Sequence, residues 1–424
     1  CMARLLMIAD DFTGALDTGV QFAARGARTC VVTDPEYDFS RAGGEIQVLV
    51  LDAETRHLPP EAAYGVVRRA VEGALSAGFT HIYKKTDSAL RGNVGAELSA
   101  VLDGARAESI PFLPALPKMD RVTRGGVHYI GGVPVAESVF GQDPFEPVRA
   151  SSVPEIIGAQ TDRPVVLHGL GERAAERCPG IHVYDAETDR DLMETGLRLG
   201  GEGLRLSAGC AGFAAALAEL LDLRGAPPVL PDLVPALLVA CGSVNPVTLR
   251  QMAVAEEHGF PPIRLKPPQK LEPAWLESAD CAAAVEKWLE TAEREKRFIL
   301  DVNDPDGCDD TDRYAGERGL TTEDLRRGIS AQLGRLVRQL LDGGLDATIL
   351  CTGGDTLLAL MRAVKVAELI PVCELDTGAV LTDFVYRGKT HHIISKSGGF
   401  GEPDLFYRLA LSLGAGDQEE DAVC

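Results

Sequence analysis

The sequence predicts an α/β protein of two domains with largely parallel sheets flanked by helices. Short apolar runs alternate along the chain with longer stretches whose apolar residues recur at helical spacing. This alternation stops in a proline-rich segment at 222–235 and restarts after it. At 424 residues the chain is long enough for two such domains, each with a sizeable core.

The first domain is predicted to span residues 1–222. Its strands are expected where short apolar runs lie between turn residues, at 5–9, 29–33, 47–51, 81–84, 164–168, 182–184 and 204–207. Helical spacing predicts helices at 15–24, 60–76, 94–102 and 212–221. The segment 121–147 is rich in Gly, Pro and Val, and predicts either a β-hairpin or an excursion that covers the substrate.

Residues 223–235 predict a linker, and the second domain is expected at 236–415. It restarts with a strand at 236–240, a turn at 241–246 and a helix to about residue 257. Further strands are predicted at 297–302, 347–351 and 390–395, and helices at 279–296 and 321–341, the latter opened by a Thr321–Asp324 capping box. The Asp-dense segment 301–312 lacks the spacing of a calcium loop and predicts a solvated loop, with contact to Mg²⁺ as the lesser alternative. Residues 416–424 predict an acidic disordered tail.

The charge balance limits the partners of this protein. A net charge of −21 disfavours nucleic acid and anionic membrane. No apolar run approaches the length of a bilayer span, and the N-terminus lacks a basic region followed by a long apolar stretch, so we expect a cytoplasmic protein. The ten cysteines show no C-x-x-C pair and leave metal ligands unassigned.

Two polar loops follow predicted strands of the first domain. In the first, Asp10 and Asp11 end an apolar run, and Thr13-Gly14 opens a helix. Helix capping explains one of these carboxylates well and two poorly. The alternative is a carboxylate that holds substrate hydroxyls or accepts a proton during the reaction.

The second loop, 84–95, gathers cations and hydroxyls in a chain that is otherwise acidic. It contains Lys84, Lys85, Thr86, Asp87, Ser88, Arg91 and Asn93. A solvated surface loop is one interpretation. However, a polyhydroxylated acid needs this mixture, with cations for its carboxylate and polar side chains for its hydroxyls, and a helix beginning near Val94 adds positive potential. Arg56, just past another predicted strand, is a further candidate.

Small-residue turns follow three strands of the second domain, at 241–243, 352–356 and 395–401. Glycines there let a phosphate approach backbone amides, and the following helix ends supply more donors, with Lys396 also available. One such turn alone would be an ordinary strand–helix connection, but three predict nucleotide binding. The absence of GxxxxGK[ST] and of a suitably placed GxGxxG disfavours a P-loop or a dinucleotide site.

The segments IADDFTGA, KKTDSALRGNVGAEL, TGGDT and SKSGGFGEPD together resemble the four-carbon acid sugar kinases, a bacterial family of ATP-dependent kinases acting on tetronates. The resemblance covers nearly the whole chain. The KKTDS–LRGN form is more similar to the D-threonate and D-erythronate kinase branch than to the 3-oxo-tetronate kinase branch. The family usually has serine where this chain has Cys210, and commonly serine at Asn245.

The resemblance implies two sets of site residues. The acceptor would be held by Asp11, Arg56, Lys85, Thr86, Asp87 and Ser88, to which the cation cluster adds Arg91. ATP would contact Ser243, Gly353, Gly354, Asp355, Thr356, Gly398 and Gly399.

The predicted function is ATP-dependent phosphorylation of the C4 hydroxyl of a sugar acid such as D-threonate or D-erythronate, with a Mg²⁺–ATP complex supplying much of the electrostatics. Acceptor and nucleotide would lie on facing domains, with the ligand site in the interdomain cleft. Asp87 and Asp11 are both candidates for the catalytic base. A homodimer is the default for such an enzyme.

Three alternatives remain beside this prediction. The first is a 3-oxo-tetronate 4-kinase. A dehydrogenase of the same architecture is disfavoured by the missing dinucleotide fingerprint. A non-catalytic sugar-acid-binding regulatory protein is disfavoured because a sensor needs only one of the two intact sets of loops.

Overall fold

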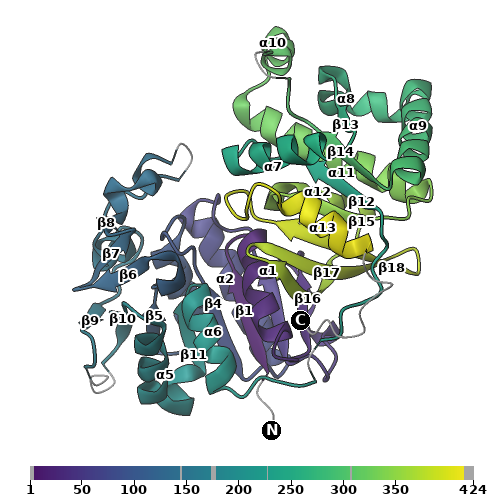
Figure 1. Cartoon of the computed structure of the whole chain (residues 1–424). Coiled ribbons are helices and arrows are strands. Elements are labelled where there is room, and N and C mark those ends of the chain that lie inside the picture. The colour runs from purple at the N-terminus through teal and green to yellow at the C-terminus, as the bar shows by residue number, and fades with distance from the viewer. Residues whose placement is uncertain (1–3, 144–145, 173–177, 227, 306–307, 415–424) are drawn as a thin grey trace. The chain divides into compact units, whose positions relative to one another are not determined.

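The computed structural model describes residues 4–143, 146–172, 178–226, 228–305 and 308–414. The chain forms two compact units, Cys1–Pro227 and Pro228–Cys424, and each contains a sheet with helices packed against it (Figure 1). The predicted α/β class with largely parallel sheets is confirmed. No helix within the described residues is both long and apolar enough to pass through a membrane. The predicted tail at 416–424 lies outside the described residues.

The first unit is built on a parallel sheet with the strand order β2-β3-β1-β4-β11-β5-β10-β9. The strands are β1 (Leu5–Ala9), β2 (Thr29–Val32), β3 (Val48–Asp52), β4 (His81–Lys85), β5 (Ser109–Leu113), β9 (Val165–His168), β10 (Gly180–Tyr184) and β11 (Leu206–Gly209). The helices are α1 (Phe12–Ala23), α2 (Pro60–Ser76), α3 (Val94–Ala105), α4 (Val153–Gly158), α5 (Asp189–Leu204) and α6 (Ala211–Leu220). The strands β1, β2 and β3 are buried along their whole length, which explains their unbroken apolar sequence.

One strand of this sheet was not predicted from the sequence. The strand β5 lies between β11 and β10, although its sequence contains Pro111. A proline within a short apolar run normally argues against a central strand, because it cannot donate a ladder hydrogen bond. Here Pro111 stands level with His182 of β10, and the strand remains parallel to its neighbour on that side.

Register brings the polar loops of the first unit to one edge of its sheet. Ala9, at the end of β1, is level with Asp52 of β3 on one side and with Lys85 of β4 on the other. Lys85 is in turn level with Gly209 of β11. The loops that begin after these residues therefore start side by side at the carboxyl ends of adjacent strands.

The segment 121–147 contains a β-hairpin, as one of its two interpretations predicted. The strands β6 (Arg121–Arg124), β7 (Val127–Ile130) and β8 (Val133–Pro134) form a small antiparallel sheet. Single-turn 3₁₀ segments precede and follow it, η2 (Pro117–Met119), η3 (Val135–Glu137) and η4 (Val139–Gln142). Buried His128 of β7 contacts the Ser88 carbonyl through Nε2 at 2.8 Å, so the hairpin packs on the loop that follows β4.

The second unit has the strand order β13-β14-β12-β15-β18-β17-β16. The first five are parallel, whereas β16, β17 and β18 pair in antiparallel fashion. The strands are β12 (Leu237–Cys241), β13 (Pro262–Arg264), β14 (Arg297–Asp301), β15 (Thr348–Thr352), β16 (Glu368–Asp376), β17 (Ala379–Tyr386) and β18 (Lys389–Lys396). The helices are α7 (Pro246–Glu257), α8 (Pro267–Leu271), α9 (Ala279–Glu295), α10 (Asp310–Glu317), α11 (Thr322–Asp342), α12 (Gly354–Val364) and α13 (Leu405–Gly414).

Several features of this unit differ from the prediction, among them the short strand β13, which was not predicted. The strands β16 and β17 were missed, because charges such as Glu374 and Asp383 interrupt their apolar pattern on a partly solvated sheet. The predicted solvated loop at 301–312 is wrong from residue 310 onward, where α10 begins. Its first turn is held by Asp304, whose carboxylate accepts hydrogen bonds from the Thr311 backbone and hydroxyl at 2.8 and 2.7 Å. The Thr321–Asp324 capping box at the start of α11 is confirmed.

Candidate functional site

Arg56 lies at the centre of the predicted acceptor residues. Its Nε is 2.8 Å from Asp10 Oδ2, and its Nη2 is 2.8 Å from Asp11 Oδ1 and 3.6 Å from Asp87 Oδ1. Burial lowers the pKa of Arg56, but Asp10, Asp11 and Asp87 outweigh this and raise it well above its ordinary value. Three loops that are distant in the sequence therefore meet on one guanidinium, and Arg56 is more central than its isolated position in the sequence suggested.

Asp11 has two roles at the start of α1. It is the N-cap residue, and its Oδ1 accepts a hydrogen bond from the Gly14 backbone at 3.3 Å. The same oxygen lies 3.6 Å from Lys85 Nζ. Among the described residues no donor is recorded for its other oxygen, Oδ2, and 27% of the side chain is exposed. Capping thus explains one oxygen of Asp11 and leaves the other available to a ligand.

Asp10 is the more deeply buried of the two adjacent carboxylates. Its Oδ2 is bound by Arg56, while its Oδ1 is buried without a hydrogen-bond partner among the described residues; Lys85 Nζ lies 3.9 Å away. Burial raises the pKa of Asp10, but Arg56 and Lys85 outweigh it and keep the pKa below its usual range. A buried ionised oxygen without a donor is costly to keep, and it suits a ligand hydroxyl.

Lys84 does not belong to the acceptor residues, although the sequence grouped it with Lys85 and Arg91. Adjacent residues of a strand face opposite sides, and Lys84 Nζ lies 2.9 Å from Glu97 Oε2, with no exposed surface on its side chain. Glu97 also accepts a hydrogen bond from the Thr55 hydroxyl. The grouping of Lys84 with the site was wrong for this reason, and Lys84 with Glu97 forms an internal ion pair.

Asp87 is held by two arginines. Arg91 binds it in a fork, with Nε at 2.8 Å from Oδ2 and Nη2 at 3.1 Å from Oδ1. Burial raises the pKa of Asp87, yet Arg56 and Arg91 outweigh it and hold the pKa far below its ordinary value. Arg91 also reaches Asp143, near the end of η4, at 3.2 Å.

The two hydroxyl residues of this loop are fixed by neighbouring segments. The Thr86 backbone N–H donates to the Gly209 carbonyl at 2.8 Å, and its hydroxyl donates to the same oxygen at 3.3 Å. Ser88 Oγ accepts a hydrogen bond from Nη1 of Arg121, the first residue of β6. Arg121 and Asp143 were not predicted as site residues, since only the three-dimensional path of the hairpin brings them to the loop. We call Asp10, Asp11, Arg56, Lys85, Asp87 and Arg91 the acceptor cluster.

Cys210 lies next to the acceptor cluster, at the N-cap position of α6. Its thiol is fully buried and donates to the Ala115 carbonyl at 3.1 Å, and its own carbonyl accepts from the Tyr83 hydroxyl at 2.6 Å. Burial raises the pKa of the Cys210 thiol to about 11. The thiol therefore remains protonated and serves as a donor within the interior.

The predicted nucleotide residues of the second unit lie at the carboxyl edge of its parallel strands. Cys241, Asp301 and Thr352 end adjacent strands in register, and Lys396 is level with Thr352. The Gly353 backbone N–H donates to the Lys396 carbonyl at 2.9 Å, which joins two of the three small-residue turns.

Gly353 sets the backbone conformation at the start of α12. Its φ of 85° is a conformation that favours glycine, and it occupies the N-cap position. The first-turn residues Gly354, Asp355 and Thr356 follow, with backbone amides that have no acceptor within the helix. Asp355 lies 3.4 Å from Arg326, and a Cβ on Gly242 would meet Thr356 Oγ1 at 2.2 Å, so the first and second turns are in close contact.

The turn at 395–401 contacts the turn at 241–243 through Gly398. A Cβ on Gly398 would lie 3.4 Å from Ser243 Oγ, and a Cβ on Gly399 would lie 3.7 Å from Asn245 Nδ2. Asn245 is the N-cap of α7 and accepts from the Val247 backbone at 2.9 Å, a capping role that serine performs equally well. All seven predicted nucleotide residues are therefore on turns that the structure brings to one edge of the second sheet.

Lys396 is the cation of this edge. Its Nζ donates to Thr248 Oγ1 and to the Gly398 carbonyl, both at 2.9 Å, and its residue is 1% exposed. No carboxylate of the described residues pairs with it, and burial lowers its pKa to about 8. An uncompensated buried ammonium beside a helix N-terminus and a glycine turn suits a phosphate group.

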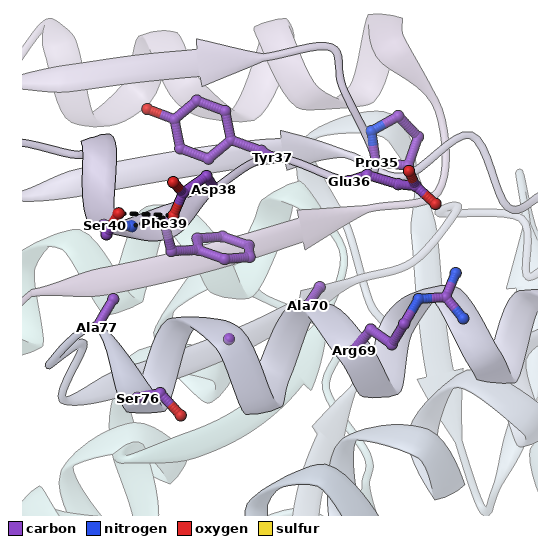
Figure 2. A pocket seen from close by; sticks show the side chains of 11 residues that line it. Pro35, Glu36, Tyr37, Asp38, Phe39, Ser40, Arg69, Ala70, Ser76 and Ala77 are labelled. Carbon is purple, nitrogen blue, oxygen red and sulfur yellow. Dashed lines mark hydrogen bonds between the residues drawn. The ribbon is translucent and has the colours of Figure 1, made fainter.

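A hollow in each unit lies away from the predicted site residues, and that of the second unit, of about 410 Å³, is lined by Leu276, Val285 and Gln339 among others. Among the described residues no cluster of three or more His, Cys, Asp or Glu side chains is arranged to hold a metal ion. A hollow of about 450 Å³ lies between α2 and the segment 35–40, and its lining residues, drawn in Figure 2, include Tyr37, Phe39 and Arg69. Asp38 at its rim accepts hydrogen bonds from the Ser40 backbone and hydroxyl. None of the predicted site residues lines this hollow.

Comparisons with known proteins divide the chain in the same way as its sites. Residues 5–217 match the model of a family described as a sugar-binding N-terminal domain, and residues 238–406 match that of a nucleotide-binding C-terminal domain. The chain is 30% identical to a D-threonate kinase of Bordetella bronchiseptica, with 96% of each chain covered. It is 27% identical to a 3-oxo-tetronate kinase of Pseudomonas savastanoi pv. phaseolicola, again with 96% of each covered.

A solved structure of a Haemophilus influenzae protein is similar to this fold. It superposes with a TM-score of 0.74 at 19% identity, over 96% of this chain and 99% of that one. The likeness supports the fold described above.

Proposed function

Because the chain belongs to the four-carbon acid sugar kinase family, it is a phosphotransferase, and we propose that it transfers the γ-phosphate of ATP to the C4 hydroxyl of a sugar acid such as D-threonate or D-erythronate. The observation that carries this proposal is the convergence of Asp10, Asp11 and Asp87 on Arg56, in the unit that matches a sugar-binding model. Such a cluster presents fixed acceptors to several hydroxyls at once.

The acceptor cluster is suited to a polyhydroxylated ligand. Asp10 Oδ1 and Asp11 Oδ2 are carboxylate oxygens without a donor among the described residues, and each accepts a hydrogen bond from a ligand hydroxyl in this proposal. Lys85, Thr86 and Ser88 complete the hydroxyl-binding surface. Because the carboxylates are already fixed by Arg56, little rearrangement is required on binding.

Between the two candidate bases, the surroundings favour Asp11. Two arginines hold the pKa of Asp87 far below its usual range, which makes Asp87 a weak proton acceptor. Asp11 is bound by Arg56 through one oxygen only and is more exposed. In the proposed step the C4 oxygen bonds to the γ-phosphorus, the bond to the ADP oxygen breaks, and the hydroxyl proton passes to Asp11.

The second unit is proposed to bind the nucleotide. The α12 amides after Gly353, the Gly398–Gly399 turn, Ser243 and Lys396 supply neutral and positive donors to the phosphates. Mg²⁺ commonly binds through substrate phosphates and retains several waters, so in this proposal it arrives bound to ATP. When bound, the ion neutralises phosphate charge.

A coupled ADP-release assay tests this proposal. The panel contains D- and L-threonate, D- and L-erythronate and 3-oxo-tetronates, each with Mg²⁺ and ATP, and ³¹P NMR locates the phosphate on the product. ADP release with one of the four tetronates and a phosphate on C4 supports the proposal. ADP release only with a 3-oxo-tetronate assigns the chain to the alternative kinase. Ligand-dependent thermal stabilisation without ADP release would overturn the catalytic proposal in favour of a sensor.

A further inference from the structure

The acceptor cluster neutralises its own cations. Arg56 is paired with Asp10 and Asp11, Lys85 lies 3.6 Å from Asp11, and Arg91 is bound by Asp87 in a fork. Three carboxylates thus balance these three cations, and the cluster brings no net positive charge to the carboxylate that every sugar acid carries. The cation for this group must come from elsewhere if the acceptor is an acid.

Arg121 is such a cation. It lies at the start of β6, and its Nη1 donates to the hydroxyl of Ser88, within the acceptor loop. No carboxylate of the described residues forms an ion pair with it, and the carboxylate that acts most strongly on its charge is Asp87. Burial lowers the pKa of Arg121, as expected for a guanidinium removed from water without a matching anion.

The position of Arg121 is fixed by packing. Its guanidinium lies 5.1 Å from the ring centroid of Phe140, and Arg91 lies at the same distance from that ring. The two arginines thus share one aromatic ring, supplied by η4, and both border the acceptor loop. Phe140 holds the planar guanidinium of Arg121 without neutralising it, which leaves the charge of Arg121 available.

From this geometry we propose that Arg121 binds the carboxylate of the acceptor and so restricts the enzyme to sugar acids. The inference rests on the proposed function and deepens it by naming the group that distinguishes acids from neutral polyols. The guanidinium supplies parallel N–H donors that match a carboxylate, and Ser88 beside it accepts or donates to the adjacent hydroxyl. Arg121 in this role is a specificity-determining residue and does not touch the transferred phosphate.

The same hairpin offers a matched control. Arg124 ends β6, is 61% exposed and pairs with Glu187 at the surface. It has the same charge and lies three residues away, but it faces away from the acceptor loop. Substituting it changes the net charge by the same amount as substituting Arg121.

The experiment compares an acid with its uncharged analogue. Binding of D-threonate and D-threonamide is measured by calorimetry, together with kcat/KM for both, in the wild type, Arg121→Gln and Arg124→Gln. We expect Arg121→Gln to weaken D-threonate binding by about 10- to 100-fold, the range for loss of hydrogen bonds to a charged group, with D-threonamide changed by less than about twofold. Arg124→Gln retains the preference of the wild type. If another tetronate proves to be the substrate, that acid and its amide replace the pair.

The outcomes separate this inference from the function on which it rests. A wild-type enzyme that phosphorylates no tetronate overturns the proposed function. A wild-type enzyme that phosphorylates the acid, with an unchanged acid-to-amide ratio in Arg121→Gln, overturns the inference alone. If Arg121→Gln does not fold, the acid-to-amide ratio is measured in Arg121→Lys, because lysine keeps the positive charge but lacks the planar guanidinium with its parallel donors. An unchanged ratio in that variant also counts against the proposal.

Discussion

Lys84 and Lys85 are adjacent in the chain, yet their ammonium groups lie on opposite faces of β4. Lys84 lies 2.9 Å from Glu97 in the interior, and Lys85 lies 3.6 Å from Asp11 in the acceptor cluster. The alternation of a strand thus places one lysine in an internal ion pair and its neighbour in the cluster that is proposed to bind the acceptor. The following predictions test these roles of the two lysines and the chemistry at the carboxyl ends of the parallel strands in both units.

Lys84→Met is expected to destabilise the protein without touching the acceptor cluster. It leaves the Glu97 carboxylate buried without its counter-charge, which costs about 3–5 kcal/mol of unfolding free energy. Urea denaturation followed by circular dichroism measures the loss. The double variant Lys84→Met/Glu97→Gln removes both charges and should recover at least half of it. A double variant no more stable than the single one would show that the two residues are not coupled.

Asp11→Asn is expected to act mainly on kcat, and Asp87→Asn mainly on the acceptor KM. If Asp11 accepts the proton, Asp11→Asn lowers kcat by about 10²- to 10⁴-fold with a small change in the acceptor KM. Asp87→Asn frees Arg56 and Arg91 from their shared anion, so it raises the acceptor KM more than it lowers kcat. Steady-state kinetics on both variants separates these effects, with the exposed Asp162→Asn as control. Near-wild-type kcat in Asp11→Asn would remove it from the role of base.

Gly14→Ala is expected to impair turnover while the fold is kept. The added Cβ would lie 2.0 Å from Lys85 Nζ and 2.5 Å from Asp11 Oδ1, both at the ends of side chains that can move away. Alanine itself is favourable in a helix. Because displacements near 1 Å cost about 10²-fold in rate, we expect kcat/KM to fall by roughly that factor at unchanged melting temperature. Gly43→Ala, where a Cβ meets no atom within 4 Å, is the control.

The affinity for ATP is expected to fall above about pH 8. Burial lowers the pKa of Lys396 to about 8, so the free enzyme loses this positive charge as the pH rises through that value. The KM for ATP should then increase by up to about tenfold per pH unit, whereas Lys396→Arg, which stays charged, should be nearly flat. The KM for ATP of the wild type and of Lys396→Arg, measured from pH 6.5 to 9.5, tests this prediction. An equal rise in both proteins would place the titration on another group.

Asp52→Asn is expected to flatten the pH dependence of stability. Burial, followed by Glu54 and Asp11, raises the pKa of Asp52 well above 3.8. The folded state therefore holds this proton where the unfolded state has lost it, and stability falls as the pH rises from about 3.8 through the folded pKa. Asparagine keeps the hydrogen bond from the Glu54 backbone to Oδ1. Urea denaturation between pH 4.5 and 7.5 should show a smaller decline in the variant, and a steeper one would contradict this account.

Much of the fold follows from local sequence pattern. Buried parallel strands such as β1 and β3 are continuous apolar runs, and the capping box of α11 is visible in two residues. The strand β5 was missed because Pro111 breaks the usual rule, and β16 and β17 because only one of their faces is consistently buried. The hydrophobic pattern of a sequence indicates whether a residue is buried, but it does not indicate which neighbouring residues bury it.

The candidate site shows the same limit. Strand ends followed by polar loops indicated Asp11, Lys85 and Asp87, since parallel strands end at one edge. The sequence and the family resemblance named Arg56 as a further candidate, but not its central place among three carboxylates, because this depends on the register of β1 with β3 and β4. Nor did the sequence reveal Arg121, which reaches Ser88 through the path of a hairpin 33 residues further along the chain.

The hairpin β6–β7–β8 carries Arg121 on a segment separate from the strand ends that position Asp10, Asp11 and Lys85. The surroundings of Arg121 and the position of these three residues can therefore change independently during evolution. The strands of the hairpin pair with one another and not with the parallel sheet that positions Asp10, Asp11 and Lys85. Substitutions in the hairpin therefore alter the surroundings of Arg121 while leaving the strand ends in place. If Arg121 binds the acceptor carboxylate as proposed, a change from one acid to another or to a neutral polyol is accessible through this hairpin, without rebuilding the groups proposed to act on the transferred phosphate.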